Sequence, residues 1–168
     1  VLPTSAVGGG TIDRAILTAS IVGYPSKRFD GTTTATLTPE NYATAGFAPG
    51  EGAAITQTVG QYDSAASGSR TVTAQLSDPN FVADSGTLLS NYILPTIASG
   101  TGVIDQAMLT AIITGRPIKT YDGTTGATLT SADYTLDGFV AGQGATITRT
   151  VGVYDSRNAG ERTVTAAL

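Results

Sequence analysis

Apolar residues in this chain recur at every second position in short runs, which is typical of β-strands with one buried face. The runs lie at residues 15–22, 34–37, 53–59, 71–76 and 91–94. In the run 71–76, Val72, Ala74 and Leu76 share one face, and polar residues occupy the other. Such short runs, separated by turn residues about every 8–12 positions, predict an all-β fold.

The turns between these runs are marked by glycine, proline and small polar residues. Residues 38–41 predict one helical turn or a tight loop, because a capping threonine stands directly before a proline. Residues 60–68 indicate a longer loop, and the glycine-containing residues 98–102 indicate a short flexible linker. Gln57 stands on the apolar face of the run 53–59, which indicates an edge strand or a bulge.

The chain is a tandem duplication with a period of 92 residues. Ile12 and Asp13 recur as Ile104 and Asp105, and roughly 60% of the first copy is identical in the second, without insertion. The predicted parts are the tail of a preceding repeat with its linker at 1–11, a first repeat at 12–97, a linker at 98–103, and a second repeat at 104–168 that is truncated at its C-terminal end. Each repeat predicts a β-sandwich, and two in a row predict a beaded rod.

The composition narrows the classes of function. The 168 residues carry a net charge of −4 without a basic cluster, so nucleic acid and anionic membranes are not expected partners. No apolar run is long enough to span a bilayer, and we expect no membrane insertion by this segment. Histidine and cysteine are absent from the sequence, which removes the usual bases and nucleophiles, and we expect no enzymatic activity.

A turn motif marks the phase of the repeat. It consists of Phe29, Asp30, Gly31, Thr32 and Thr33, and it returns as Tyr121, Asp122, Gly123, Thr124 and Thr125. An aspartate accepts hydrogen bonds from the backbone two residues on, and glycine tolerates a positive φ, so the motif predicts a tight turn before a strand. Asp63 and Asp155 also recur, and a catalytic carboxylate pair with Asp30 or Asp122 is the alternative to ordinary turn caps.

Two sets of charged residues suggest further chemistry. Lys27 and Lys119 are the only lysines and occupy equivalent positions; an isopeptide bond to Asn or Asp is the alternative to an ion pair with a nearby aspartate. The candidate ligands for Ca²⁺ between domains are Asp13, Asp78, Asp84 and Asp105. No aspartate series typical of a calcium loop is present, so we expect no cofactor, with calcium as the alternative.

Exposed side chains and the start of the chain give two alternatives for binding. Tyr24, Tyr62 and Tyr154 are candidates for stacking on sugars, and the threonine arrays for a sugar- or ice-facing surface, but packed rings and solvated strand faces are the commoner roles. Residues 1–4 repeat part of the strand at 91–94, and would complete the second repeat of another chain by strand addition. The alternative is that the rest of a longer array supplies that strand.

The ordered motifs resemble a known bacterial repeat. Leu17-Thr18, the Lys27 turn, Gly46-Phe47, Thr71-Val72-Thr73 and the closing Asn91-Tyr92-Ile93-Leu94-Pro95-Thr96 follow one another as in the YDG repeat of filamentous-haemagglutinin-like bacterial exoproteins and adhesins. The first copy has Phe29 at the position of the name-giving tyrosine. The resemblance implies an Ig-like unit, and the complete fold prediction is two tandem Ig-like antiparallel β-sandwich domains forming an elongated rod.

The same resemblance implies a function. We expect non-enzymatic stalk or spacer repeats of a large secreted or surface-anchored bacterial adhesin, which extend a distal binding region from the cell. The expected location is secreted or at the bacterial cell surface, and the expected partners are neighbouring repeats of the same chain and a host or matrix ligand reached through distal domains. The alternatives are an adhesion module that binds carbohydrate, matrix or ice, and a subunit of a strand-exchanged extracellular filament.

Overall fold

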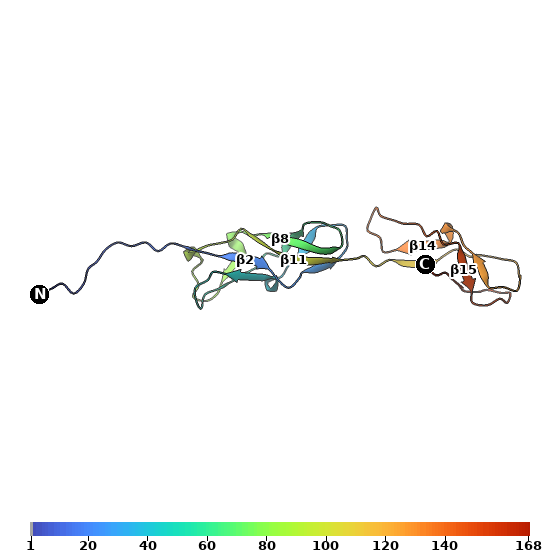
Figure 1. Cartoon of the computed structure of the whole chain (residues 1–168), viewed down its shortest axis with the longest axis horizontal. Helices are drawn as coiled ribbons and strands as arrows, with labels where there is room; N and C mark the ends of the chain where they lie inside the picture. The colour runs from blue at the N-terminus through green and yellow to red at the C-terminus, as the bar shows by residue number, and fades with distance from the viewer. Residues whose placement is uncertain (1) are drawn as a thin grey trace. The chain divides into compact units, whose positions relative to one another are not determined.

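The structure is a computed structural model that describes residues 2–168 and divides into two compact units (Figure 1). Unit 1 ends at Gln106, and unit 2 comprises Ala107–Leu168. The regular elements are strands and single 3₁₀ turns, so the all-β prediction is confirmed. Residue 1 of the predicted tail lies outside the described residues, whereas residues 2–14 form no strand and expose their side chains.

Unit 1 contains eleven short strands and three 3₁₀ turns. The strands are β1 (Ala15–Ile16), β2 (Thr18–Ile21), β3 (Ser26–Arg28), β4 (Thr34–Thr36), β5 (Tyr42–Ala45), β6 (Ala53–Ile55), β7 (Val59–Tyr62), β8 (Gly68–Gln75), β9 (Phe81–Ala83), β10 (Tyr92–Ile93) and β11 (Ile97–Asp105). The turns are η1 (Pro39–Asn41), η2 (Asp78–Asn80) and η3 (Leu89–Asn91). The helical turn predicted at 38–41 is confirmed as η1, where the Asn41 side chain accepts a hydrogen bond from the Thr38 amide at 2.9 Å.

The strands of unit 1 pack in layers around one core. The largest sheet has seven strands in the order β4-β7-β8-β11-β2-β5, with β3 paired to β11, while β6 pairs with β9 and β1 with β10. Ile55 of β6 and Phe81 of β9 belong to the same buried cluster as Val72 of β8 and Leu37. Burial of an apolar side chain of this size stabilises a fold by about 1.5–3 kcal/mol, so this contact holds the layers together. The prediction that the sheets pack face to face as a sandwich is therefore confirmed.

Strand β11 is the largest departure from the sequence-based prediction, because the flexible linker expected at 98–103 is wrong. β11 lies inside the sheet and pairs antiparallel with β8, from Ile97 opposite Gln75 to Ile104 opposite Gly68. Ala98 and Ile104 are 0% and 1% exposed. The second predicted repeat therefore begins inside a strand of unit 1.

The glycines of β11 suggest flexibility in the sequence but serve close packing in the fold. A Cβ on Gly100 would collide with the carbonyl oxygen of Ile21 in β2. A Cβ on Gly102 would lie 2.6 Å from the carbonyl oxygen of Pro25 and 2.6 Å from a methyl group of Val72. Glycine within a strand marks such close approach of two backbones, and here it allows β11 to fit between its neighbours.

The prediction that the strands are antiparallel is wrong for the first and last segments of unit 1. Residues 15–28 run in the same direction as residues 92–105: β1 pairs with β10, β2 pairs with β11 at Ser20 and Ser99, and β3 pairs with β11 from Val103 to Asp105. Because these segments are parallel neighbours, the chain enters unit 1 at one end and leaves it at the other (Figure 1).

Two boundaries in the middle of unit 1 also differ from the prediction. The run 53–59 divides between β6 and β7, which belong to different sheets, and Gln57 lies in the crossing between them. The predicted loop 60–68 contains most of β7. Gly60 lies within that strand. A Cβ at this position would lie 2.9 Å from the Leu37 side chain, so this glycine again marks close packing.

Unit 2 contains a subset of the same elements. Its strands are β12 (Thr110–Ile113), β13 (Gly126–Thr128), β14 (Tyr134–Asp137), β15 (Val151–Tyr154) and β16 (Val164–Thr165), with the turn η4 (Ser131–Asp133). They correspond to β2, β4, β5, β7, β8 and η1. β12 pairs with β14, and β13, β15 and β16 form a separate sheet. Among the described residues, no strand of unit 2 corresponds to β1, β3 or β6, whose partners in unit 1 are β10, β11 and β9.

We expect Gly102→Val to destabilise unit 1 by about 2 kcal/mol or more, because the new side chain overlaps Pro25 and Val72. Chemical denaturation followed by circular dichroism would measure the change. Thr101→Val is the matched control, since Thr101 lies next to Gly102 with its side chain exposed. Equal stability of the two variants would contradict the buried position of β11.

Candidate functional site

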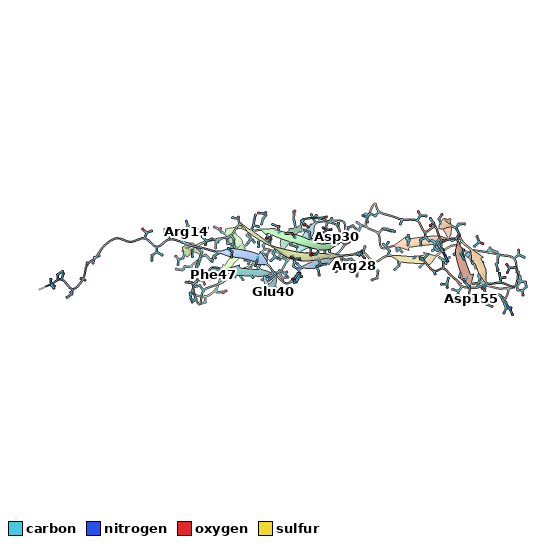
Figure 2. The ribbon with its side chains drawn as sticks, in the orientation of Figure 1. Arg14, Arg28, Asp30, Glu40, Phe47 and Asp155 are labelled. Carbon is cyan, nitrogen blue, oxygen red and sulfur yellow. The ribbon has the colours of Figure 1, made fainter. Side chains whose placement is uncertain are left out.

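The turn motif of unit 1 is held by Lys27. Its Nζ donates hydrogen bonds to Asp30 Oδ1 at 2.6 Å, to Thr32 Oγ1 at 2.7 Å and to the Thr32 carbonyl at 2.9 Å. Asp30 Oδ1 also accepts from the Thr32 amide at 2.8 Å, and Gly31 between them has a φ of 79°. The aspartate turn that the sequence predicts consists of these hydrogen bonds. It begins after the end of β3, on the surface of unit 1 (Figure 2).

Unit 2 repeats this arrangement atom for atom. Lys119 Nζ donates to Asp122 Oδ1 at 2.7 Å and to both oxygens of Thr124 at 2.8 Å, and Gly123 has a φ of 76°. We call this arrangement of lysine, aspartate and threonine the Lys–Asp–Thr turn. Since it persists in a unit that lacks several strands of unit 1, its geometry is set by the local sequence.

The Lys–Asp–Thr turn is joined to the sheet by two contacts with a tyrosine, one through a backbone hydrogen bond and one through the lysine. The carbonyls of Thr33 and Thr125 accept hydrogen bonds from the amides of Tyr62 and Tyr154, at 2.7 and 2.8 Å. The lysine Nζ lies over the ring of the same tyrosine, 5.8 Å from the centroid in unit 1 and 5.9 Å in unit 2. The motif itself does not identify these tyrosines, because each lies about thirty-five residues after its lysine.

The two tyrosines pack within their units. Tyr62 is buried, and its hydroxyl donates to the carbonyl of Pro25 at 2.9 Å; the Tyr154 hydroxyl donates to the carbonyl of Pro117 at 2.7 Å. Tyr24, in contrast, is exposed. At the variable position of the motif, Phe29 packs against the core of unit 1 and Tyr121 is exposed.

The lysine contact lowers the pKa of the motif aspartates. The pKa of Asp30 falls from its ordinary 3.8 to about 2, chiefly because of the hydrogen bond from Lys27, with further contributions from Thr32. The pKa of Asp122 falls in the same way to about 2, chiefly through Lys119. A carboxylate held ionised and saturated by donors in this way fixes the turn and is a poor proton acceptor.

The lysines form ion pairs at the surface. The Asp30 side chain is 54% exposed and the Asp122 side chain 55%. An isopeptide bond requires a lysine and its acceptor in a buried setting beside a carboxylate, whereas here the lysine side chains are 18% and 26% exposed and their aspartate partners are more than half exposed. The arrangement supports the ion pair over the cross-link.

The candidate calcium ligands lie on four different segments. Asp13 is in the exposed segment before β1, Asp78 begins η2, Asp84 follows β9, and Asp105 ends β11. Within residues 2–168, no group of three or more acidic, histidine or cysteine side chains is arranged to hold a metal ion. Asp63 and Asp155 follow β7 and β15, where their amides donate to the carbonyls of Thr71 and Thr163 at 2.9 Å.

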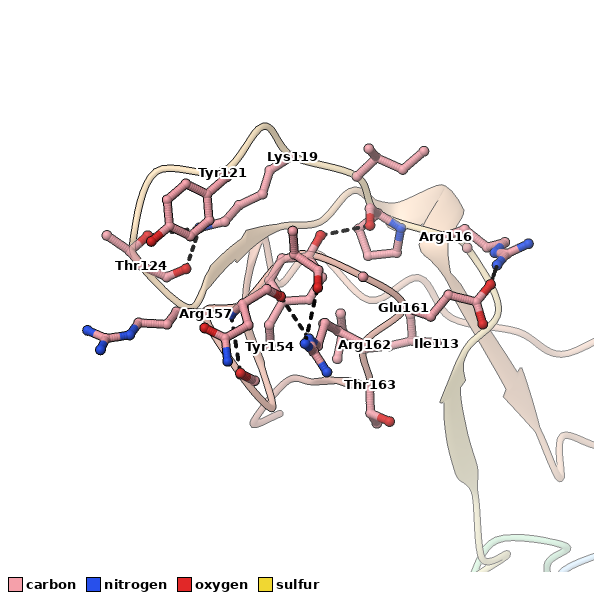
Figure 3. A pocket seen from close by; sticks show the side chains of 18 residues that line it. Ile113, Arg116, Lys119, Tyr121, Thr124, Tyr154, Arg157, Glu161, Arg162 and Thr163 are labelled. Carbon is pink, nitrogen blue, oxygen red and sulfur yellow. Dashed lines mark hydrogen bonds and ion pairs between the residues drawn. The ribbon is translucent and has the colours of Figure 1, made fainter.

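Unit 2 contains a groove beside its Lys–Asp–Thr turn. It encloses about 690 Å³, and Ile113, Pro117, Tyr154 and Val164 contribute to its lining (Figure 3). A smaller hollow of about 170 Å³ adjoins β12, β14 and β16. Arg116 and Glu161 form an ion pair of 2.9 Å between the segment after β12 and the loop before β16.

Each unit is thus a β-rich repeat carrying one Lys–Asp–Thr turn. The chain belongs to the YDG domain family, whose model matches residues 13–99 and 105–168. Neither the comparison with curated proteins nor that with solved structures found a match. In the part of the chain that the structure describes, no helix has the length and apolar character needed to cross a membrane.

We expect Lys27→Met to raise the pKa of Asp30 toward 3.8, because the largest cause of its lowering is removed. A carbon-detected NMR titration of the aspartate carboxyl groups would measure it. Lys119→Met is the matched control and should raise the pKa of Asp122 alone. Since both folded pKa values are depressed, the carboxylates stabilise the fold fully above about pH 4 and lose that effect as the pH falls toward 2. An unchanged Asp30 titration in Lys27→Met would contradict the Lys–Asp–Thr turn.

Proposed function

We propose that this chain is a pair of non-enzymatic spacer repeats in the stalk of a large secreted or surface-anchored bacterial adhesin. The observation that carries the proposal is the parallel pairing of residues 15–28 with residues 92–105 in unit 1. Entry and exit at opposite ends make each repeat an extender, since every added copy moves the chain forward by the length of a unit.

The connection between the repeats supports the same role. Four residues, 106–109, separate the end of β11 from the start of β12. The proposal includes a rod of Ig-like units whose stability is close to a sum over units and their junctions.

The Lys–Asp–Thr turn has a structural role in this proposal. It recurs in both units with the same contacts. In each unit the side chains of the lysine, the aspartate and the threonine form hydrogen bonds with one another. A surface ion pair contributes little to stability by itself, but this one fixes the turn between β3 and β4. Repeats that keep this local geometry can vary elsewhere without losing their register.

The location and partners follow from the stalk role. The protein would be exported and lie outside the cell, at the surface or released from it. Its partners would be neighbouring repeats of the same chain, and a host or matrix ligand would be bound by distal domains.

We expect polypeptides with increasing numbers of copies of residues 14–105 to lengthen by equal steps of about 45 Å, the extent of fourteen residues in extended strands. Small-angle X-ray scattering would give the maximum dimension of each polypeptide. Lengthening that falls off with copy number would show freely hinged units and contradict the stalk.

The same scattering measurement tests calcium. Since the four candidate aspartates lie on separate segments, we expect an identical profile with and without EDTA. Replacing 106–109 by a longer glycine-serine segment is the control for sensitivity, because it should visibly shorten the mean dimension. A change on adding EDTA would favour calcium at the junctions.

A further inference from the structure

Each Lys–Asp–Thr turn contains an Asp-Gly pair, a sequence that is open to a side reaction of its own backbone. The chain has three such pairs, Asp30-Gly31, Asp122-Gly123 and Asp137-Gly138. In an Asp-Gly pair the glycine amide nitrogen can attack the aspartate side-chain carbon Cγ, because glycine has no Cβ to hinder the approach. The N–Cγ bond forms, the Cγ–O bond of the protonated carboxyl breaks, and water leaves with the amide proton. The product is a five-membered succinimide.

The succinimide damages the backbone when water opens it. Opening at one carbonyl restores aspartate, whereas opening at the other leaves isoaspartate, in which the main chain passes through Cγ and is longer by one carbon atom. At Asp30 this change would displace the connection between β3 and β4. The Thr33 carbonyl in that connection accepts a hydrogen bond from the Tyr62 amide at 2.7 Å. Isomerisation at Asp30 would therefore loosen the turn from the sheet.

The contacts of Asp30 oppose the first step of this reaction. Its Oδ1 accepts from Lys27 Nζ at 2.6 Å and from the amide and the hydroxyl of Thr32, both at 2.8 Å. Ring closure requires a protonated carboxyl, since an ionised carboxylate has no leaving group. Donors on Oδ1 favour the ionised form, and their hydrogen bonds would be disturbed as Cγ becomes tetrahedral. The turn thus holds its aspartate in the unreactive state.

The same contacts recur at Asp122. Its Oδ1 accepts from Lys119 Nζ at 2.7 Å and from the amide and the hydroxyl of Thr124, both at 2.9 Å (Figure 3). Lys27 and Lys119 are the only lysines of the chain. Because their aspartate partners are more than half exposed, the ion pairs add little to stability. The larger effect of both lysines is to keep the aspartate ionised.

We propose that Lys27 and Lys119 protect the Asp-Gly pairs of their turns against succinimide formation and isomerisation. Replacing the glycine would also slow the reaction, but the turn requires a φ of 79° at Gly31 and 76° at Gly123, which favours glycine. The turn therefore keeps a reactive sequence for the sake of its shape, and the lysine suppresses the reaction. This protection is independent of the proposed stalk role.

Ageing of the whole chain at about pH 5 tests the protection, with isoaspartate at each Asp-Gly pair measured by digestion and mass spectrometry. In Lys27→Met we expect isoaspartate at Asp30 to form about 10- to 60-fold faster than in wild type. The pKa of Asp30 would rise from about 2 toward 3.8, and each pKa unit changes the protonated fraction about tenfold. Asp122 should be unaffected in this variant, and Lys119→Met should accelerate isomerisation at Asp122 alone.

The third Asp-Gly pair is the reference within the chain. Asp137 ends β14, and within residues 2–168 no lysine or arginine forms an ion pair with it. Its rate of isomerisation should therefore be the same in wild type, in Lys27→Met and in Lys119→Met. A rise at Asp137 equal to that at Asp122 in Lys119→Met would show general loosening of unit 2 and overturn the proposal for that turn.

Two further measurements separate protection by the lysine charge from loss of structure. Lys27→Arg keeps the positive charge and should isomerise at Asp30 at a rate close to that of wild type. In guanidinium chloride, where the contact is lost, wild type and Lys27→Met should isomerise at Asp30 equally fast. An unchanged Asp30 rate in folded Lys27→Met would reject the protection. Equal acceleration in Lys27→Arg and Lys27→Met would also reject it, because loss of packing would then explain the change.

Discussion

The backbone ladder between β11 and β8 is the contact on which unit 1 depends. It joins eight residue pairs and places β11 between two halves of the sheet that have no other ladder between them. β2 and β5 lie on one side of β11, and β8, β7 and β4 lie on the other. Without β11, the edges of β2 and β8 would present unpaired amides and carbonyls beside an open core. In unit 2, β12 and β16, the counterparts of β2 and β8, belong to separate sheets.

Much of the fold was predictable because local pattern and final burial agree. The alternation in 71–76, the capped turn at 38–41 and the Asp-Gly turns depend on neighbouring residues, and the structure has them where the sequence indicates. β11 was missed because a strand with glycine at two inward positions has the composition of a linker. Its glycines are explained by the backbone carbonyls of Ile21 and Pro25, which lie more than seventy residues earlier in the chain, and by the side chain of Val72.

The candidate site likewise has a part set by neighbouring residues and a part set by residues distant in the sequence. The aspartate, glycine and threonine of the Lys–Asp–Thr turn are close in sequence, and a turn cap was the expected role of Asp30 and Asp122. The ring beneath the lysine comes from a strand about thirty-five residues later, and nothing local to the motif identifies Tyr62 or Tyr154 as its source. Local chemistry was therefore predictable, and the long-range contacts that tie the turn to the sheet were not.

The parallel arrangement of the first and last segments of unit 1 has a mechanical consequence. Tension applied through the chain would pull β1, β2 and β3 one way and β10 and β11 the other, along the direction of the strands. The hydrogen bonds between these segments would then be loaded in shear and would have to break together. Had the end strands been antiparallel neighbours, the same tension would peel them apart one bond at a time.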